Sequence, residues 1–222
     1  MSSSNRLANH NGSVVTHLLC RQHIKYTPHL AVASSAGPDS TCLLFLLRRM
    51  IDLKRKSSHG SGVDLPDTIA SFHVDHNLQA DAKKMARAAS TSATRFKAAS
   101  HVELRVRWGE APFPVRPGDG EAVESLARNA RYQLMFDAMV RRDMYVLATG
   151  HHADDQVETV LMRLGAGSSM LGLGGMRPLR RFGMALGKAE NDFGWFGHEG
   201  LNRWIARPLL EVSKVRARVI TE

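Results

Sequence analysis

Cysteine is scarce in this sequence, and long apolar runs are missing altogether. Only Cys20 and Cys42 occur among 222 residues, and they form no CxxC pair. This excludes a structural zinc site and a framework of disulfides, and it favours a reducing compartment. Cys42 stands in an apolar stretch, where we expect it to pack rather than to react. No apolar run approaches the roughly 20 residues of a membrane span, so no membrane partner is expected.

Acidic residues are missing from the beginning of the chain. Residues 1–38 contain Arg6, Arg21 and Lys25 but no Asp or Glu. Residues 1–28 therefore form a basic N-terminal segment. This segment is compatible with the remains of an organelle transit sequence, and equally with a loose basic N-terminus that leads into a short helix. The first interpretation predicts a mitochondrial protein and the second a cytoplasmic one.

Positive charge exceeds negative charge over the whole sequence. The formal net charge is +9 and the isoelectric point is near 10.1. This excess indicates a polyanionic partner, with nucleic acid as the leading candidate, and a solubilising surface excess is the alternative. The length and the 43% share of hydrophobic residues are sufficient for one sizeable α/β core.

Strand patterns alternate with helical patterns along the chain. Strands are predicted at residues 29–34, 68–74, 102–108 and 144–149. Helices are predicted at residues 40–47, 80–98, 121–142 and 154–164. This alternation predicts the α/β class, with a doubly wound, mainly parallel sheet and helices on both faces. Residues 29–164 form the predicted core, and residues 165–222 a glycine- and arginine-rich excursion, mobile up to residue 200, and a closing segment of the same domain.

A turn of small residues joins the first predicted strand to the first predicted helix. It consists of Ser35, Ala36, Gly37, Pro38, Asp39 and Ser40. Such a turn directs several backbone N–H groups into one volume at a helix N-terminus, where an anion such as phosphate is stabilised. An ordinary strand–turn–helix junction is the alternative. The turn is neither the common Gly-Lys-Ser/Thr loop, because no Lys precedes Ser40, nor the dinucleotide GxGxxG loop.

Polar residues gather at two further places. Asp75 and His76 follow the second predicted strand, at the edge where open parallel sheets bind their ligands. In the helix at 121–142, Arg128, Arg131 and Tyr132 lie together beside the buried face, since residues three and four apart are neighbours.

The densest polar cluster follows the fourth strand. It contains His151, His152, Asp154, Asp155 and Glu158. Asp155 and Glu158 are three apart and share one face of the predicted helix. The cluster indicates a divalent metal site, a pocket in which carboxylates hold a cationic substrate, or a well-capped helix with an acidic first turn. The apolar residues of this helix are predicted to face the core: Val157, Val160, Leu161 and Leu164.

Six short motifs follow one another along the chain. They are SxGPDS at 35–40, VDHxL at 74–78, ARxxRY at 127–132, TGHHxDDxxET at 149–159, GLxGM at 172–176 and RPLL at 207–210. The chain resembles, over residues 29–210, the catalytic N-terminal domain of the tRNA(Ile)-lysidine synthases, which belong to the N-type ATP pyrophosphatases with a PP-loop. Ala36 stands where that family usually has the first Gly of SGGxDS. The resemblance implies a Rossmann-like fold of the adenine nucleotide alpha hydrolase type.

The resemblance also implies an activity. Such an enzyme uses ATP and Mg²⁺ to adenylate the C2 oxygen of the wobble cytidine in tRNA(Ile) with a CAU anticodon, and pyrophosphate leaves. The ε-amine of free L-lysine then displaces AMP to form lysidine. The partners expected are therefore this tRNA and lysine. The oligomeric state is left open, a homodimer included.

Residue roles follow from the matched motifs. The loop at 35–40 would cradle the pyrophosphate, with Asp39 as the Mg²⁺ ligand, and Asp75 and His76 would lie beside the nucleotide. Arg128 would contact ATP and the reacting base.

The lysine would be positioned by His151, Asp155 and Glu158. Arg207 would be a second cation near the ATP or the tRNA. Adenylyl transfer needs mainly positioned cations and backbone donors around phosphate, which these residue types supply.

Three other functions remain open at this point. A tRNA-thiolating PP-loop enzyme would need catalytic or cluster-binding cysteines, and Cys20 and Cys42 are poorly placed for that. A metal-dependent hydrolase would use the His and Asp residues at 151–155, and would leave Asp39 without a role. A non-catalytic RNA-binding relative is the third, for which Ala36 is an argument.

Overall fold

A computed structural model of the chain describes residues 29–56, 66–116, 123–165, 167, 174–183 and 194–215. Outside these residues lie the predicted N-terminal segment at 1–28, residues 166, 168–173 and 184–193 of the predicted excursion at 165–200, and residues 216–222. No helix in the described ranges is long and apolar enough to cross a membrane.

Within the described ranges, six strands form one sheet. They are β1 (His29–Ala33), β2 (Thr68–Asp75), β3 (Ser100–Arg105), β4 (Val146–Ala148), β5 (Leu179–Arg181) and β6 (Trp204–Ala206). The strand order is β3-β2-β1-β4-β6-β5, and every neighbouring pair is parallel except β5 with β6. The predicted mainly parallel sheet is thereby confirmed.

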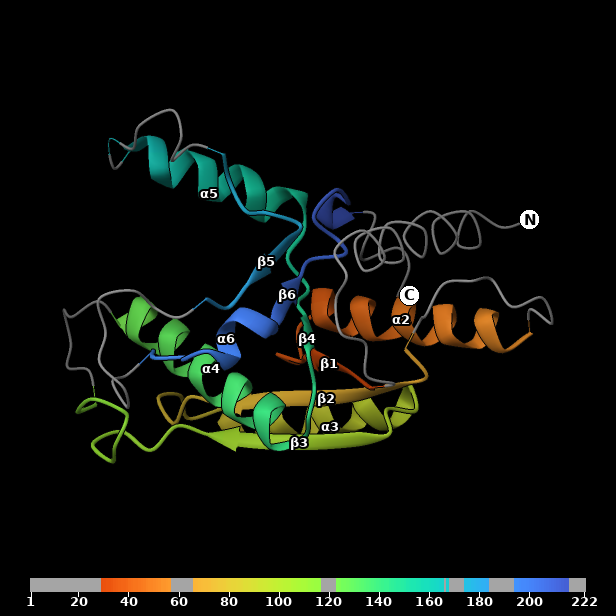
Figure 1. Ribbon diagram of the computed structural model, residues 1–222, viewed down its shortest axis with the longest axis horizontal. Coiled ribbons are helices and arrows are strands. Elements are labelled where there is room, and N and C mark those ends of the chain that lie inside the picture. Colours follow the sequence, from red (N-terminus) through yellow and green to blue (C-terminus); the bar gives the residue numbers. More distant parts are fainter. Residues whose placement is uncertain are drawn as a thin grey trace.

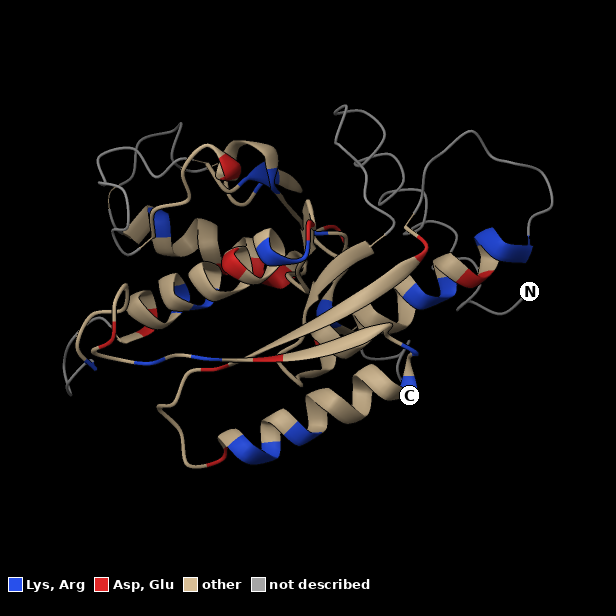
Figure 2. Ribbon diagram, turned by 60° about the horizontal axis from the view of Figure 1, so that its bottom comes forward, with Lys and Arg blue, Asp and Glu red and all other residues tan. Residues whose placement is uncertain are grey.

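Helices connect the parallel strands. They are α2 (Pro38–Lys56), α3 (Ala82–Arg95), α4 (Val123–Arg141), α5 (Ala153–Gly165) and α6 (Glu199–Asn202). Figure 1 shows α2 and α4 on either side of the central strands, and α5 standing away from the sheet. Basic residues occur along several helices, as the blue ribbon segments of Figure 2 show. The last turn of α2 carries Lys54, Arg55 and Lys56, whose positive charges are favourable at the negative C-terminal end of the helix dipole.

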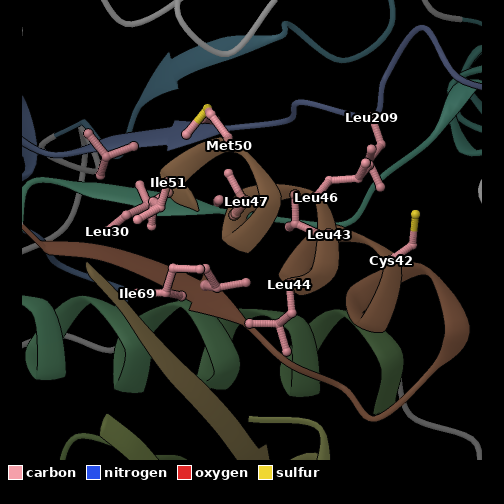
Figure 3. Close-up of a cluster of buried hydrophobic side chains, with 14 of the residues drawn as sticks. Leu30, Cys42, Leu43, Leu44, Leu46, Leu47, Met50, Ile51, Ile69 and Leu209 are labelled. Carbon is pink, nitrogen blue, oxygen red and sulfur yellow. The ribbon is translucent and has the colours of Figure 1, made fainter. Parts of the chain in front are cut away.

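The core has two layers because strand side chains alternate between the faces of the sheet. Leu30 and Val32 of β1 pack with the apolar face of α2, whereas Ala31 packs with α4. In α2, buried leucines recur at helical spacing and lie between the helix and the sheet (Figure 3). Cys42 is one of these buried residues, as predicted. The periodicity of the sequence therefore has a direct counterpart in the packing.

The order of the strands determines the location of the site. After β1 the chain builds β2 and β3 on one side, and it then crosses to β4 and β6 on the other. The strand order thus reverses between β1 and β4, and open α/β sheets bind ligands at such a point, beyond the carboxyl ends of the strands. The residues after β1, β2 and β4 meet there.

Two predictions about the second half of the chain are wrong. The apolar face of α5 is not in the core, because Val157, Leu161 and Leu164 are 58%, 61% and 52% exposed. Periodicity identifies an apolar stripe but does not say whether a sheet lies beneath it, and α5 has no buried residue. The segment at 165–200 is also not wholly an excursion, since β5 pairs with β6 and extends the sheet.

Stability depends on the layer between α2 and the sheet. Leu47 is 1% exposed there, whereas Leu53 of the same helix is 43% exposed. We expect Leu47→Ala to lower the free energy of unfolding by about 2–5 kcal/mol, because it leaves a cavity, and Leu53→Ala by less than about 1 kcal/mol. Urea unfolding of both variants measures the difference, and equal losses would contradict this account of the core.

Candidate active site

The loop after β1 has the predicted form. Pro38 is the first residue of α2, where its missing N–H costs nothing. Ser40 Oγ accepts a hydrogen bond from the Ser35 N–H at 3.2 Å and donates one to the Gly37 carbonyl at 3.0 Å. The Ser40 hydroxyl thus closes the loop over the helix N-terminus. The predicted strand–loop–helix geometry of an anion site is present.

Ala36 has a left-handed backbone with φ 64°. This conformation costs an L-residue other than glycine roughly 1–2 kcal/mol. Ala36 therefore adopts the conformation that favours glycine. The Ala in place of the family's Gly thus raises the energy of the loop but leaves its backbone path in the glycine-type conformation.

Asp39 supplies an unpaired carboxylate oxygen. Its Oδ1 is buried and has no hydrogen-bond partner, while Oδ2 lies 3.7 Å from His152 Nε2. A buried carboxylate oxygen without a partner is costly unless a cation or donor occupies the space beside it. Mg²⁺ prefers such oxygen ligands, so this side chain fits a bound magnesium ion.

The turn after β4 packs directly on this loop. A Cβ added to Gly150 would lie 3.1 Å from the Asp39 carbonyl and from the Ser40 nitrogen. The absence of a side chain thus allows the two backbones to approach. As a result the histidines of the turn stand beside Asp39.

His152 belongs to the matched motif, but the resemblance gave it no role. It is 3% exposed, and its ring lies between Asp39 and Asp155, with Nδ1 3.4 Å from Asp155 Oδ2. Asp155 Oδ2 also accepts the His152 backbone N–H at 2.8 Å. The Asp155 carboxylate therefore caps its own helix and holds the histidine in place. The doubled histidine in the sequence was the available signal.

A cavity of about 310 Å³ opens beside the loop. It is lined by Ala33, Ser34, Ser35, Asp39, Ser40, His73, Val74, His76, Gln79, Met85, Arg131, Tyr132, Met135, Thr149, Gly150 and His151. Of the predicted site residues it brings together Ser35, Asp39, Ser40, His76 and His151. Arg131 and Tyr132, which carried no predicted role, complete its wall.

Two histidines in this wall are held neutral. His76 Nε2 accepts a hydrogen bond from Arg131 Nε at 3.3 Å, and burial together with that guanidinium lowers the pKa of His76 to about 4. Burial, and then the charges of Arg207 and Arg128, lower the pKa of His151 to about 4. Each ring therefore acts at neutral pH as an uncharged donor and acceptor.

The two predicted arginines lie near Tyr132. Arg207 is 2% exposed, donates to the Arg177 carbonyl at 2.7 Å and is close enough to Tyr132 for their charges to interact. The Arg128 guanidinium lies 5.2 Å from the centre of the Tyr132 ring. Neither arginine is among the residues that line the cavity.

Three acidic residues lie outside the cavity. Asp75 turns toward Arg105, 3.4 Å away, and accepts the Asn77 N–H. Glu158 is exposed on α5 and Asp155 is engaged in capping.

Metal coordination by the cluster after β4 is also not supported. No group of three or more His, Cys, Asp or Glu side chains within the described ranges is arranged to hold a metal. Asp154, which that interpretation needs, accepts the backbone N–H of Lys214 at 2.9 Å.

The chain matches the model of the PP-loop domain over residues 10–220. It belongs to the PP-loop domain family. Membership of this family implies the use of ATP.

Two curated relatives carry the name tRNA(Ile)-lysidine synthase. The protein of Rhodopseudomonas palustris is 32% identical over 195 residues, which cover 86% of this chain and 45% of the relative. That of Bradyrhizobium diazoefficiens is 34% identical over 194 residues, covering 87% and 44%. This PP-loop chain thus spans less than half the length of either relative.

Solved structures share the fold at low identity. The U34-tRNA thiolase NcsA of Methanococcus maripaludis, with its [4Fe-4S] cluster, is 15% identical with a TM-score of 0.64, covering 97% of this chain and 63% of that one. The NAD⁺ synthetase of Burkholderia pseudomallei is 11% identical with a TM-score of 0.53, covering 99% and 74%. These neighbours support the PP-loop fold alone.

Relief of the left-handed backbone at Ala36 should be measurable. We expect Ala36→Gly to raise the free energy of unfolding by about 0.5–1 kcal/mol, since glycine adopts φ 64° without strain but loses more chain entropy on folding. Lys97→Gly, at φ 53° outside the cavity lining, is the matched control and should give a similar gain. A loss of stability in Ala36→Gly alone would contradict the conformation described for the loop.

The neutral histidines make stability depend on pH. In the unfolded chain, His76 and His151 become protonated below about pH 6.5. In the folded chain they become protonated only near pH 4. The free energy of unfolding should therefore fall as the pH drops from about 6.5 to about 4. Urea unfolding across this range should show a shallower fall in His151→Asn, and an unchanged fall in the exposed control His198→Asn. Equal slopes in wild type and His151→Asn would refute the assignment.

Proposed function

We propose that this PP-loop chain is the catalytic part of an ATP-dependent carbon–nitrogen ligase that forms lysidine in tRNA(Ile). Its substrates are ATP, free L-lysine and the wobble cytidine of a CAU anticodon. The names of the curated relatives support this proposal, as do the matched motifs. The observation that carries it is the unpaired Asp39 carboxylate oxygen beside a loop of anion-binding geometry at the cavity.

The loop end of the cavity serves the first step. The backbone N–H groups at 35–40 and the N-terminus of α2 would hold the leaving pyrophosphate. Asp39 would hold Mg²⁺, which when bound neutralises the phosphate charge. Arg131 lines the same cavity and adds a fixed positive charge, while His76 offers a neutral donor beside the nucleotide. The cytidine C2 oxygen attacks the α-phosphorus, and the bond to pyrophosphate breaks.

The end of the cavity at His151 serves the second step. The neutral imidazole of His151 lies in the wall and can hydrogen-bond the lysine amine without competing charge, but with a pKa of about 4 it orients that amine and does not take its proton. The amine must lose a proton before its nitrogen attacks C2 and AMP leaves. Asp155 contributes through His152 rather than by facing the cavity. Glu158, which is exposed on α5, would meet lysine only at the outer rim.

Thiolation is disfavoured by the cysteines. Cys42 lies on the buried face of α2, and burial raises the pKa of its thiol to about 12. No cysteine lines the cavity in the part of the chain that the structure describes. The similarity to a tRNA thiolase is thus one of fold.

The deciding measurement is incorporation of labelled lysine into a CAU-anticodon isoleucine tRNA with ATP and Mg²⁺. We expect activity in the wild type and a loss of at least about 100-fold in Asp39→Asn, because the cation ligand is removed. Asp52→Asn, on the same helix and paired with Arg48, is the matched control and should remain active.

Each other result overturns part of the proposal. Release of AMP or pyrophosphate that depends on tRNA, without lysine incorporation, means that RNA is adenylated for another nucleophile. Binding of tRNA without ATP consumption identifies a non-catalytic RNA-binding relative. Lysine incorporation that survives in Asp39→Asn would reject the role of this carboxylate.

A further inference from the structure

We propose that Arg180 binds a backbone phosphate of the RNA substrate, as part of a group of guanidinium groups around Tyr132. This Tyr132 cluster consists of Arg128, Tyr132, Arg180 and Arg207. The inference rests on the proposed function in taking RNA as the substrate. It adds a residue of β5 that no sequence motif assigned.

The cluster is assembled from three distant parts of the chain. Arg128 and Arg180 lie over the Tyr132 ring, with their guanidinium carbons 5.2 and 5.6 Å from its centre. Arg207, which follows β6, lies close enough to Tyr132 and Arg180 for their charges to interact, and it is 2% exposed. Tyr132 itself is 8% exposed and lines the cavity. Three guanidinium groups therefore surround one buried ring at the edge of the proposed active site.

These cations have no carboxylate partner among the described residues. Five described cations elsewhere form ion pairs: Arg48 with Asp52, Lys54 with Asp67, Arg105 with Asp75, Arg107 with Glu110 and Arg203 with Glu199. By contrast, no ion pair is found for Arg128, Arg180 or Arg207, and the buried Nε of Arg207 has no hydrogen-bond partner. Positive charges gathered in this way repel one another, so the arrangement favours a bound anion.

The position of Arg180 favours RNA over ATP as the source of that anion. Arg180 is not among the residues that line the cavity at the loop 35–40, whereas Tyr132, whose ring it contacts, is. Arg180 is therefore not one of the groups that surround a nucleotide bound at the loop. The second polyanion of the proposed reaction is RNA, and a planar guanidinium matches the geometry of a phosphate group.

The neighbouring residue provides a matched control. Arg180 and Arg181 are successive residues of β5, and their side chains point to opposite faces of the sheet. The Arg181 guanidinium lies 4.8 Å from the Trp204 ring, on the face that packs with α2, whereas Tyr132 belongs to the face of α4. Both arginines carry the same charge on the edge strand β5, so the comparison separates the face of the sheet that each side chain occupies from the total charge of the strand.

The test compares Arg180→Gln with Arg181→Gln in equilibrium binding of tRNA over a range of salt concentrations. Loss of one phosphate contact should weaken binding roughly tenfold at low salt and make the slope of log K against log salt shallower by about 0.7–0.9. Arg181→Gln should bind within about twofold of the wild type with the same slope. The affinity for ATP, measured without tRNA, should be unchanged in both variants.

Three outcomes would overturn the inference. These are an unchanged slope in Arg180→Gln, an equal effect in Arg181→Gln, and weakened ATP binding in place of weakened tRNA binding. Arg180→Lys keeps the charge, so it should keep the slope while losing part of the affinity. It remains informative if Arg180→Gln unfolds. Because the readout is binding, loss of lysine incorporation with this pattern intact would reject the proposed function and not the phosphate contact.

Discussion

The site depends on a single close approach between two stretches of backbone. Gly150, directly after β4, lies against the backbone of Asp39 and Ser40 at the start of α2, where an added Cβ would be only 3.1 Å from those backbone atoms. Through this contact the turn that carries the two histidines is fixed against the anion-binding loop. His152 then extends the contact to the first turn of α5 through Asp155. Parts of the chain more than 100 residues apart thus form one wall.

The electrostatic character of the cavity follows from which groups are charged. Two of its rings, His76 and His151, are neutral because burial, and then nearby guanidinium charges, lower their pKa. Positive charge comes instead from arginine, which does not lose its proton at physiological pH. Such a wall attracts phosphate while its histidines remain uncharged hydrogen-bonding groups.

Local patterns predicted the central part of the molecule well and its periphery less well. The strand, turn and helix at 29–56 follow from alternation, small residues and apolar spacing, which all act over a few residues. The prediction that α5 is buried was wrong, because Val157 and Leu161 form an apolar stripe on the helix whether or not a sheet packs against it. Asp155 looked like a substrate ligand because spacing does not reveal that its carboxylate caps the helix. Arg180 was unassigned because its meeting with Tyr132 requires β5 to return antiparallel to β6.

The burial of Cys42 determines how this thiol responds to oxidants and electrophiles. A thiol with a pKa of about 12 is ionised in only about one molecule in 10⁵ at pH 7, and the thiolate is the form that oxidants and electrophiles attack. The helix beneath the anion-binding loop therefore carries a sulfur atom that is chemically silent. Peroxide and alkylating reagents would therefore react slowly with Cys42. The helix that begins at the loop can contain a cysteine on its core-facing side without making the loop sensitive to oxidation at that position.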